Sequence, residues 1–255
     1  MLFDLTGKIA FISGGAGLLG RKHAEAIIEH GGIAIVADCD EEATHRVCSE
    51  LGPKAIPLCI DITDKDALEK ELEYFSKIDI LINNAAKDPT PNTVTSGETK
   101  FETMTMDYWL DGLNVALHGT FICSQVISRK MVKNGGGVIL NISSDLGVIA
   151  PDQRIYDEST PKPITYSASK WAVIGMTKYL ATYFADKNIR VNSLCPSGVN
   201  NNFPDEFVDR LSNLIPMGRM ANADEYKGAV VFMCSDASSY MTGSNIIIDG
   251  GRTSW

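Results

Sequence analysis

The sequence has 255 residues, of which 44% are hydrophobic and 22% are charged, enough to bury one sizeable core. Its net charge of -9 and pI near 4.9 argue against a nucleic-acid-binding surface, because phosphate binding needs clustered Lys and Arg. The amino terminus has no signal-peptide pattern, and no apolar run approaches the ~20 residues of a membrane span. The 6 cysteines form neither a C-x-x-C pair nor a metal-ligand spacing. These features predict a cytoplasmic protein with reduced thiols, no metal site and no membrane partner.

Short β-branched runs alternate with longer helical patterns along the chain. Several runs are apolar on both faces, as in residues 33–37, which is typical of a parallel sheet covered by helices on both sides. Helix starts are predicted at Thr63, followed by Asp66, and at Asn222, followed by Glu225. We predict an α/β fold in a single domain, 1–255, built on a doubly wound parallel sheet. Its seven or so strands are expected at 8–13, 33–37, 55–59, 78–82, 137–142, 190–194 and 244–249.

The first predicted strand leads into a glycine-rich turn, residues 13–20, and a helix is expected from about Leu19. Glycines at such a turn let the backbone approach a pyrophosphate, whose charge is favoured by free N–H groups at the helix start. Asp38 follows the second strand, where its carboxylate can accept hydrogen bonds from a ribose 2'-hydroxyl and repel a 2'-phosphate. No Lys or Arg stands at 39–42, so NAD is predicted over NADP. The alternatives are a turn packed for its own sake and a solvated loop carboxylate.

Tyr166 and Lys170 stand four residues apart at the start of a helical pattern, so both project from one face. An ammonium near a phenol favours the phenolate, and a Tyr of lowered pKa can shuttle a proton near neutral pH. Ser144, at the end of the preceding predicted strand, is placed to hold a substrate oxygen. Tyr183 and Lys187 have the same spacing, but we interpret them as solvated helix surface.

Over nearly all of its length the chain resembles the classical short-chain dehydrogenase/reductase family. The resemblance implies a Rossmann-like fold and an NAD(P)-dependent oxidoreductase that transfers a hydride at a CH–OH group. It also implies that Tyr166 is the proton shuttle, Lys170 its charge partner and Ser144 the donor to the substrate oxygen. The matching motifs occur in the family's order: the glycine turn 13–20, Asp38, Asp61-Ile62, Asn83-Asn84-Ala85-Ala86, Ser143-Ser144, Tyr166-x-x-x-Lys170, Pro196-Ser197-Gly198-Val199 and Asp249-Gly250-Gly251.

The same resemblance assigns the cofactor contacts. Tyr166, Lys170 and the ribose-binding Asp38 are among them. The glycine turn contributes Gly14, Gly17, Leu18, Leu19 and Gly20, and the adenine pocket contributes Asp61 and Ile62. The residues beside the ribose are Asn84, Ala85 and Ala86, and those over the nicotinamide are Pro196, Ser197, Gly198 and Val199. Three of these depart from the family pattern. Leu18, Ala86 and Ser197 stand where the family has glycine, and we expect them to trim the cofactor cleft without closing it.

A fourth departure lies in the long helical segment before Gly119. The family usually places a catalytic Asn three residues before this glycine, and the residue here is Ala116. Asn114 is close in sequence, but two residues along an α-helix turn it by about 200°. We therefore interpret Asn114 as a helix-surface amide. The residue that in the family positions a water beside the Lys is then missing.

Three segments at the predicted substrate edge are polar or turn-rich: 87–106, 147–165 and 200–220. Loops at this edge usually carry specificity. Their hydroxyls, amides and charges suit a sugar, a sugar phosphate or another polyol better than a steroid or an acyl chain. Lys87, Arg154 and Lys162 are candidate anion contacts, with solvated surface as the alternative. A weaker similarity is to dehydrogenases of flagellin-modification and surface-sugar pathways.

Two other functions stay open at this point. One is a dinucleotide-sensing or scaffold protein that kept the fold and lost the chemistry, and the other is a nucleotide-sugar epimerase or dehydratase. Members of the family commonly form homodimers or homotetramers through the helices at 107–134 and 166–186 and through the last strand. Trp255 could anchor a neighbouring subunit or fold back on its own chain.

Overall fold

The computed structural model of the protein describes residues 2–87 and 97–255. Its strands form one parallel sheet in the order β3-β2-β1-β4-β5-β6-β7. The order reverses between β1 and β4, and α/β sheets bind ligands beyond the strand ends at such a point. All seven predicted strands are present, with ends shifted by two residues at most: β1 Ile9–Ser13, β2 Ile33–Asp38, β3 Ala55–Cys59, β4 Ile80–Asn83, β5 Gly137–Ile142, β6 Ile189–Pro196 and β7 Asn245–Ile248.

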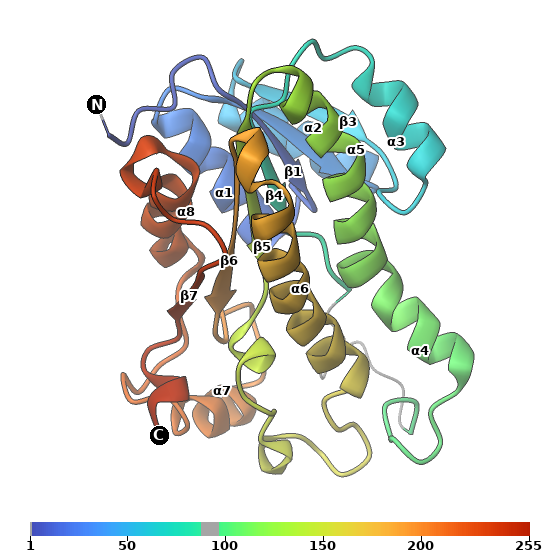
Figure 1. Ribbon diagram of the computed structural model, residues 1–255. Coiled ribbons are helices and arrows are strands. Elements are labelled where there is room, and N and C mark those ends of the chain that lie inside the picture. Colours follow the sequence, from blue (N-terminus) through green and yellow to red (C-terminus); the bar gives the residue numbers. More distant parts are fainter. Residues whose placement is uncertain (1, 88–96) are drawn as a thin grey trace.

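Helices cover both faces of this sheet, which confirms the predicted doubly wound fold (Figure 1). Helices α1, α2 and α8 pack on one face around a core that includes Ile12, Val36 and Leu140. Helices α3, α5 and α6 pack on the other face around Phe11, Leu81 and Ile139. The bounds are α1 Leu18–Glu29, α2 Glu41–Leu51, α3 Lys65–Leu72, α4 Met106–Leu113, α5 Thr120–Lys133, α6 Ile164–Tyr183, α7 Asp205–Ser212 and α8 Lys227–Cys234.

The structure confirms the predicted helix start at Asn222 and shifts the one predicted at Thr63. Asn222 and Glu225 form a capping box at the short 3-10 turn that leads into α8, as predicted. The predicted start at Thr63 is wrong by one residue, because Asp64 caps α3 by accepting the N–H of Ala67 at 3.0 Å. The amide and hydroxyl of Thr63 instead donate to the carboxylate of Asp61.

Between α4 and α5 the chain forms a π-helix, Asn114–Gly119. The α-helical geometry assumed for this segment is wrong, because a π-helix has a wider turn and the rotation of about 200° between Asn114 and Ala116 does not apply. In the structure the amide oxygen of Asn114 lies 3.4 Å from Nδ1 of His118. Ala116 is buried, and its carbonyl accepts the hydroxyl of Thr120 at 2.7 Å. At the position where the family has Asn, this chain therefore has a buried alanine. Its backbone carbonyl already accepts a hydrogen bond from Thr120.

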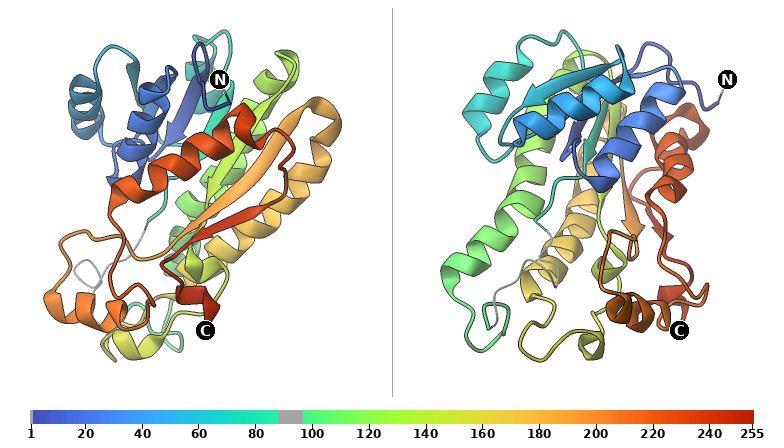
Figure 2. Two further views of the ribbon diagram at one scale, coloured as in Figure 1. Left: turned by 90° about the vertical axis from the view of Figure 1, so that its left-hand side faces the viewer. Right: turned by 180° about the vertical axis from the view of Figure 1, so that it is seen from behind.

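The carboxyl ends of all seven strands share one edge of the sheet, because the strands are parallel. Helix α7 and the carboxyl terminus lie at this end of the molecule, and the amino terminus lies at the other (Figures 1 and 2). Polar loops therefore gather where the sequence predicts substrate and cofactor. Among the helices of residues 2–87 and 97–255, none is long and apolar enough to cross a bilayer.

We expect His23 in α1 to make the stability of the fold sensitive to acid. Its ring is fully buried, and neither nitrogen has a hydrogen-bond partner among the described residues. Burial lowers the pKa of His23 from 6.5 to about 4. The unfolded chain therefore binds this proton as the pH falls below 6.5, and the folded chain binds it only near 4. We expect this histidine to remove about 3 kcal/mol of unfolding free energy between those two pH values.

The measurement is chemical denaturation of the wild type and a His23→Leu variant at pH 7 and at pH 4. The decline in unfolding free energy should be smaller in the variant, because leucine binds no proton. Carboxylates titrate in both proteins and cancel in the comparison. An equal decline in the two proteins would show that His23 is not the acid-sensitive group.

Candidate active site

The three predicted catalytic residues lie at the carboxyl edge of the sheet on two packed elements. Tyr166 and Lys170 belong to the first turns of α6, and Nζ of Lys170 lies 5.6 Å from the centre of the Tyr166 ring. Lys170 is only 4% exposed, and its ammonium donates to the carbonyl of Ile142 at 2.9 Å. Ser144 follows β5 and begins the 3-10 turn Asp145–Gly147, which packs against α6.

Two close contacts fix this turn against the helix. The hydroxyl of Ser143 donates to the carbonyl of Lys170 at 2.9 Å. A Cβ atom on Gly147 would lie 2.9 Å from the same carbonyl oxygen, so the turn approaches α6 more closely than a side chain permits. Ser144 is therefore held in a constant relation to the helix that carries Tyr166.

The second Tyr–Lys pair has none of this context. Tyr183 is 62% exposed at the end of α6, and the ammonium of Lys187 pairs with Asp186 at 2.8 Å. The interpretation of Tyr183 and Lys187 as solvated helix surface is confirmed.

The glycine turn has the close backbone packing that a dinucleotide site requires. Gly14 has a φ of 61°, and a Cβ atom there would lie 2.8 Å from Cα of Ala85. A Cβ atom on Gly20 would collide with the carbonyl of Gly14. Gly17 begins α1 without a side-chain cap, so the N–H groups of the first turn remain available to an anion. Leu18, which replaces a family glycine, is 44% exposed and does not fill the turn.

Asn84 ties the end of β4 to this turn. Its side-chain amide donates to the carbonyls of Ser13 at 3.1 Å and Gly14 at 3.0 Å. The backbone N–H groups of Asn84 and Ala85 both donate to the hydroxyl of Ser13. The structure thus brings the predicted ribose-flanking residues, including the half-buried Ala86, beside the predicted pyrophosphate turn.

Asp38 lies against the opposite side of the turn at the end of β2. Its Oδ2 accepts the N–H of Ala16 at 3.2 Å, and its Oδ1 accepts the N–H of Asp40 at 3.3 Å. Each oxygen keeps a further acceptor position for a ribose hydroxyl. At the end of β3, Asp61 accepts from Thr63, while Ile62 is buried against Gly119.

Residues 196–199 begin at the last residue of β6 and complete the predicted cofactor cleft. Ser197 is 9% exposed, and its hydroxyl donates to Asp145 at 2.6 Å. A Cβ atom on Gly198 would lie 2.6 Å from Cδ2 of Leu211, so the loop packs directly on α7. Val199 continues into an isolated bridge with Ala221. The hydroxyl that Ser197 adds to the family pattern is therefore bonded inside the protein.

The three candidate anion contacts have different surroundings. Lys87 pairs with Asp111 at 2.6 Å, and Arg154 forms a two-pronged pair with Asp152. That guanidinium and the backbone N–H of Arg154 lower the pKa of Asp152 to about 2. Lys162 alone of the three lies at the predicted site, with Nζ 4.0 Å from the centre of the Tyr166 ring.

A cavity of about 520 Å³ adjoins the start of α6. It lies between residues 99–102 and 151–167, and its polar lining includes Lys100, Gln153, Lys162 and Ser167. The amide of Gln153 bonds both the N–H and the carbonyl of Lys162, which fixes the backbone of this loop. Residues 88–96 of the predicted substrate segment 87–106 lie outside the described residues.

The other two substrate segments, 147–165 and 200–220, share a small hydrophobic cluster. Phe207 of α7 packs 5.5 Å from Tyr156 and 5.3 Å from Phe203, measured between ring centres. Ile155 and Leu211 complete the contact between the segments. The two predicted substrate segments 147–165 and 200–220 therefore pack against each other.

Sequence reasoning missed two buried charges beside Ser144. Asp145 is 2% exposed and pairs with Arg252 at 2.9 Å. The only sequence feature that pointed to a role for Asp145 was its position next to Ser144. Nothing in the sequence indicates that Asp145 pairs with Arg252 in the last turn. Among the described residues, no three His, Cys, Asp or Glu side chains gather in a way that could hold a metal ion.

Comparison with known proteins agrees with this geometry. The family profile described as Enoyl-(Acyl carrier protein) reductase matches residues 15–253. An NAD-dependent glycerol dehydrogenase of Listeria innocua is 33% identical, over 98% of this chain and 96% of its own length. A D-threitol dehydrogenase of Mycolicibacterium smegmatis is 30% identical, over 98% and 95%. Post-translational flagellin modification protein A of Campylobacter coli is 29% identical, over 97% of this chain and 98% of its own length.

Solved structures extend the comparison to the whole fold. A short-chain dehydrogenase of Leptospira borgpetersenii with bound NAD+ has a TM-score of 0.87 and 32% identity, over 98% of this chain and 94% of that one. A gluconate 5-dehydrogenase of Burkholderia cenocepacia in complex with NADP and tartrate has a TM-score of 0.86 and 28% identity, over 100% and 98%. The relatives thus include chains with either dinucleotide. This chain belongs to the short-chain dehydrogenase/reductase family and is an oxidoreductase that acts on alcohol groups.

Proposed function

We propose that the protein transfers a hydride reversibly between NAD and a secondary alcohol of a polyol, sugar or sugar phosphate. The observation that carries this proposal is the placement of Tyr166 and the buried Lys170 against the Ser144 turn. A dinucleotide-sensing protein would not require this juxtaposition. The fit of the glycine turn to a pyrophosphate, argued above, supports the cofactor part.

Each side chain has one task in the proposed reaction. In oxidation, the phenolate oxygen of Tyr166 accepts the proton of the substrate hydroxyl. Ser144 holds the same substrate oxygen, and the ammonium of Lys170 stabilises the phenolate charge. Bound NAD supplies the hydride acceptor. Lys170 is buried and keeps its position through its hydrogen bond to the Ile142 carbonyl, whereas Tyr166 is half-buried.

The cofactor residues are proposed on the same geometry. Gly14, Gly17, Leu18, Leu19 and Gly20 would hold the pyrophosphate, Asp38 the adenosine ribose, and Asp61 and Ile62 the adenine. Asn84, Ala85 and Ala86 would flank the cleft, and Pro196, Ser197, Gly198 and Val199 would cover the nicotinamide. Solved relatives hold NAD or NADP, so the choice of NAD rests on Asp38.

Replacing Asp38 by alanine is expected to weaken NAD binding by about 10- to 100-fold, because the ribose loses hydrogen bonds to a charged acceptor. Binding of NADP should be unchanged or stronger, because the carboxylate no longer repels the 2'-phosphate. Dissociation constants for both dinucleotides, measured by titration, test this. Glu42→Ala removes an exposed carboxylate from the first turn of the nearby helix α2; it is the matched control and should change neither value. Unchanged discrimination in Asp38→Ala would assign cofactor choice elsewhere.

The cavity at the start of α6 supports a polyol or sugar substrate through its polar groups, which stand among apolar side chains and two glutamates, Glu102 and Glu158. Its amide, hydroxyl and ammonium groups can each bind a hydroxyl or a phosphate oxygen. The glycerol and threitol dehydrogenases among the relatives also support this class. The flagellin-modification relative supports a role in surface-sugar metabolism more weakly, since its printed name gives no reaction.

The test is NADH formation from NAD on free polyols, sugar phosphates, nucleotide sugars and simple secondary alcohols. Turnover confined to free polyols or sugar phosphates is the expected result. Epimerisation or dehydration of a nucleotide sugar without net NADH formation would favour the second alternative. NAD binding with silence across all groups would favour the sensing function.

We also propose a homodimer or homotetramer in the cytoplasm. Large apolar side chains stand exposed on the helices expected at the subunit contact, including Leu110 of α4, Phe121 of α5 and Trp171 of α6. Trp255 is 78% exposed, although its indole N–H donates to the carbonyl of Leu214 at 3.3 Å. All six cysteines are free, which suits a reducing compartment. Light scattering should give a mass of two or four chains.

A further inference from the structure

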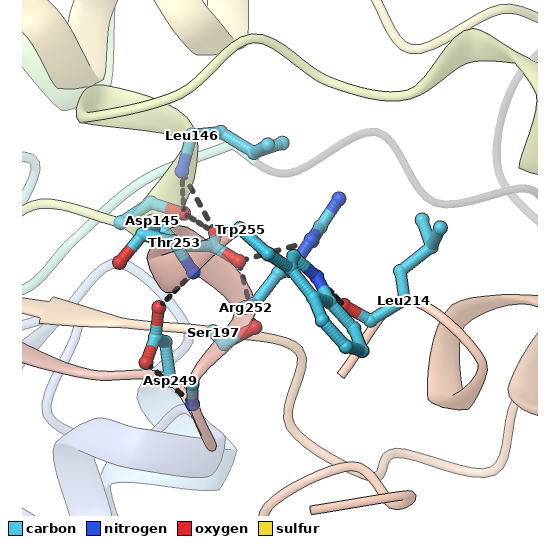
Figure 3. A network of polar contacts seen from close by, with 10 residues as sticks. Asp145, Leu146, Ser197, Leu214, Asp249, Arg252, Thr253 and Trp255 are labelled. Carbon is cyan, nitrogen blue, oxygen red and sulfur yellow. Dashed lines mark hydrogen bonds and ion pairs between the residues drawn. The ribbon is translucent and has the colours of Figure 1, made fainter. Parts of the chain in front are cut away.

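The carboxylate of Asp145 connects three segments at the predicted active site (Figure 3). Its Oδ1 accepts the hydroxyl of Ser144 at 2.8 Å and the N–H of Leu146 at 2.7 Å. Its Oδ2 accepts the hydroxyl of Ser197 at 2.6 Å and the guanidinium of Arg252 at 2.9 Å. One buried group thus joins the end of β5, the loop after β6 and the last turn of the chain.

The last turn is built to direct Arg252 inward. After Gly251, which has a φ of 91°, residues Arg252–Ser254 form a 3-10 turn. The carboxylate of Asp249 accepts the N–H groups of Gly251 at 2.9 Å and Thr253 at 2.7 Å. Arg252 is consequently 6% exposed, although it stands three residues before the last residue of the chain. Figure 3 shows its side chain reaching Asp145 from this turn.

These contacts determine what Ser144 can do. A hydroxyl has one proton to donate and two positions at which it accepts. In the structure the proton of Ser144 goes to Asp145, and one acceptor position is filled by the N–H of Leu146 at 3.1 Å. The remaining position can accept a substrate O–H. To donate to a carbonyl oxygen, Ser144 must first release Asp145, and the charge on that carboxylate opposes the release.

Arg252 and Ser197 counter this opposition because both donate to the other carboxylate oxygen. Donors on Oδ2 draw negative charge away from Oδ1 and weaken its hold on the Ser144 proton. The ion pair also prevents an unpaired charge in the interior, which would be strongly destabilising. The pair is therefore placed to leave Ser144 able to turn toward the substrate.

We propose that Asp145 is the positioning residue of Ser144, and that Arg252 weakens the hydrogen bond between Asp145 and the Ser144 hydroxyl. The carboxyl-terminal turn that carries Arg252 is then part of the active site. This inference rests on the proposed function only in that Ser144 is taken to hold the substrate oxygen. The link through Ser197 extends the same control to the loop over the predicted nicotinamide position.

The experiment compares two double variants that both remove the ion pair. Asp145→Asn with Arg252→Met keeps an amide oxygen that can accept from Ser144, whereas Asp145→Leu with Arg252→Met removes it. Replacing a buried ion pair by neutral groups often preserves stability, so both should melt near the wild-type temperature. We expect kcat of the Leu variant to be lower than that of the Asn variant by about tenfold or more, as for the loss of one good hydrogen bond. Equal kcat values would show that the pair serves stability alone and would overturn the proposal.

A second comparison holds if the Leu variant fails to fold. In Arg252→Met alone, Oδ2 of Asp145 loses its guanidinium donor and Oδ1 holds the Ser144 hydroxyl more strongly, so kcat should be lower than in the variant that also carries Asp145→Asn. The opposite order would contradict the tuning role.

The two proposals fail in different ways. If the wild type turns over no alcohol, the proposed function is wrong, and the inference is decided by NADH affinity, measured by fluorescence. The Leu double variant should then bind NADH about threefold or more weakly than the Asn variant, because Ser197 loses its partner. Equal NADH affinities of the two double variants would contradict the inference in that case too.

Discussion

Replacing Tyr166 by phenylalanine is expected to lower kcat by roughly 10²- to 10⁴-fold, the usual contribution of a positioned acid or base. The ring that packs under Lys162 and beside Lys170 is retained, and only the oxygen that accepts the substrate proton is lost. NAD affinity and the melting temperature should therefore stay close to those of the wild type. Steady-state kinetics, a cofactor titration and a thermal melt measure the three quantities.

Tyr183→Phe provides the matched control for this substitution. It removes the same oxygen from the same helix, but at an exposed position beside Lys187. Its kcat should equal that of the wild type. Substantial activity in Tyr166→Phe would assign the proton transfer to another group and would remove the main support for the proposed reaction.

Replacing Lys170 by methionine is expected to cause a second large loss, with kcat falling by about 100-fold or more because the phenolate loses its neighbouring positive charge. The buried carbonyl of Ile142 also loses its donor, which should cost about 1–3 kcal/mol of unfolding free energy. NAD binding should weaken as well, because the resemblance to the family also counts Lys170 among the cofactor contacts. Kinetics, denaturation and a cofactor titration separate these effects.

Lys178→Met is the control for that substitution. Lys178 is exposed near the other end of α6, and its ammonium lies 3.4 Å from the carbonyl of Gly243. The variant should retain wild-type activity. A Lys170→Met enzyme that loses stability but keeps its kcat would show that Lys170 is a structural lysine.

The strands could be predicted from the sequence because β-branched runs bounded by turn residues leave few alternatives for a buried parallel sheet. The start of α3 could not, because Thr63 and Asp64 are both good caps, and the choice depends on the contact of Thr63 with Asp61. The π-helix was missed since hydrophobic periodicity does not report which carbonyl each N–H bonds. Composition and residue spacing do not show which of two nearby caps, or which of two helical hydrogen-bond patterns, the chain adopts.

At the candidate site, spacing predicted the residues that neighbour one another in sequence, and folding decided the rest. Lys87, Arg154 and Lys162 were equivalent candidates, and nearby carboxylates hold the first two away from the Tyr166 ring. The pairing of Asp145 with Arg252 joins residues 107 positions apart, and only the path of the last turn brings them together. Long-range pairs between buried charges therefore required the structure.

The most direct test of the proposed reaction is deuterium transfer from a carbon-deuterated polyol, such as glycerol or threitol, to NAD. The wild type should form NADH that carries one substrate deuterium, as mass spectrometry detects, and Tyr166→Phe should form almost none. Formation of unlabelled NADH, or equal labelling by the two proteins, would contradict hydride transfer at a polyol carbon assisted by Tyr166.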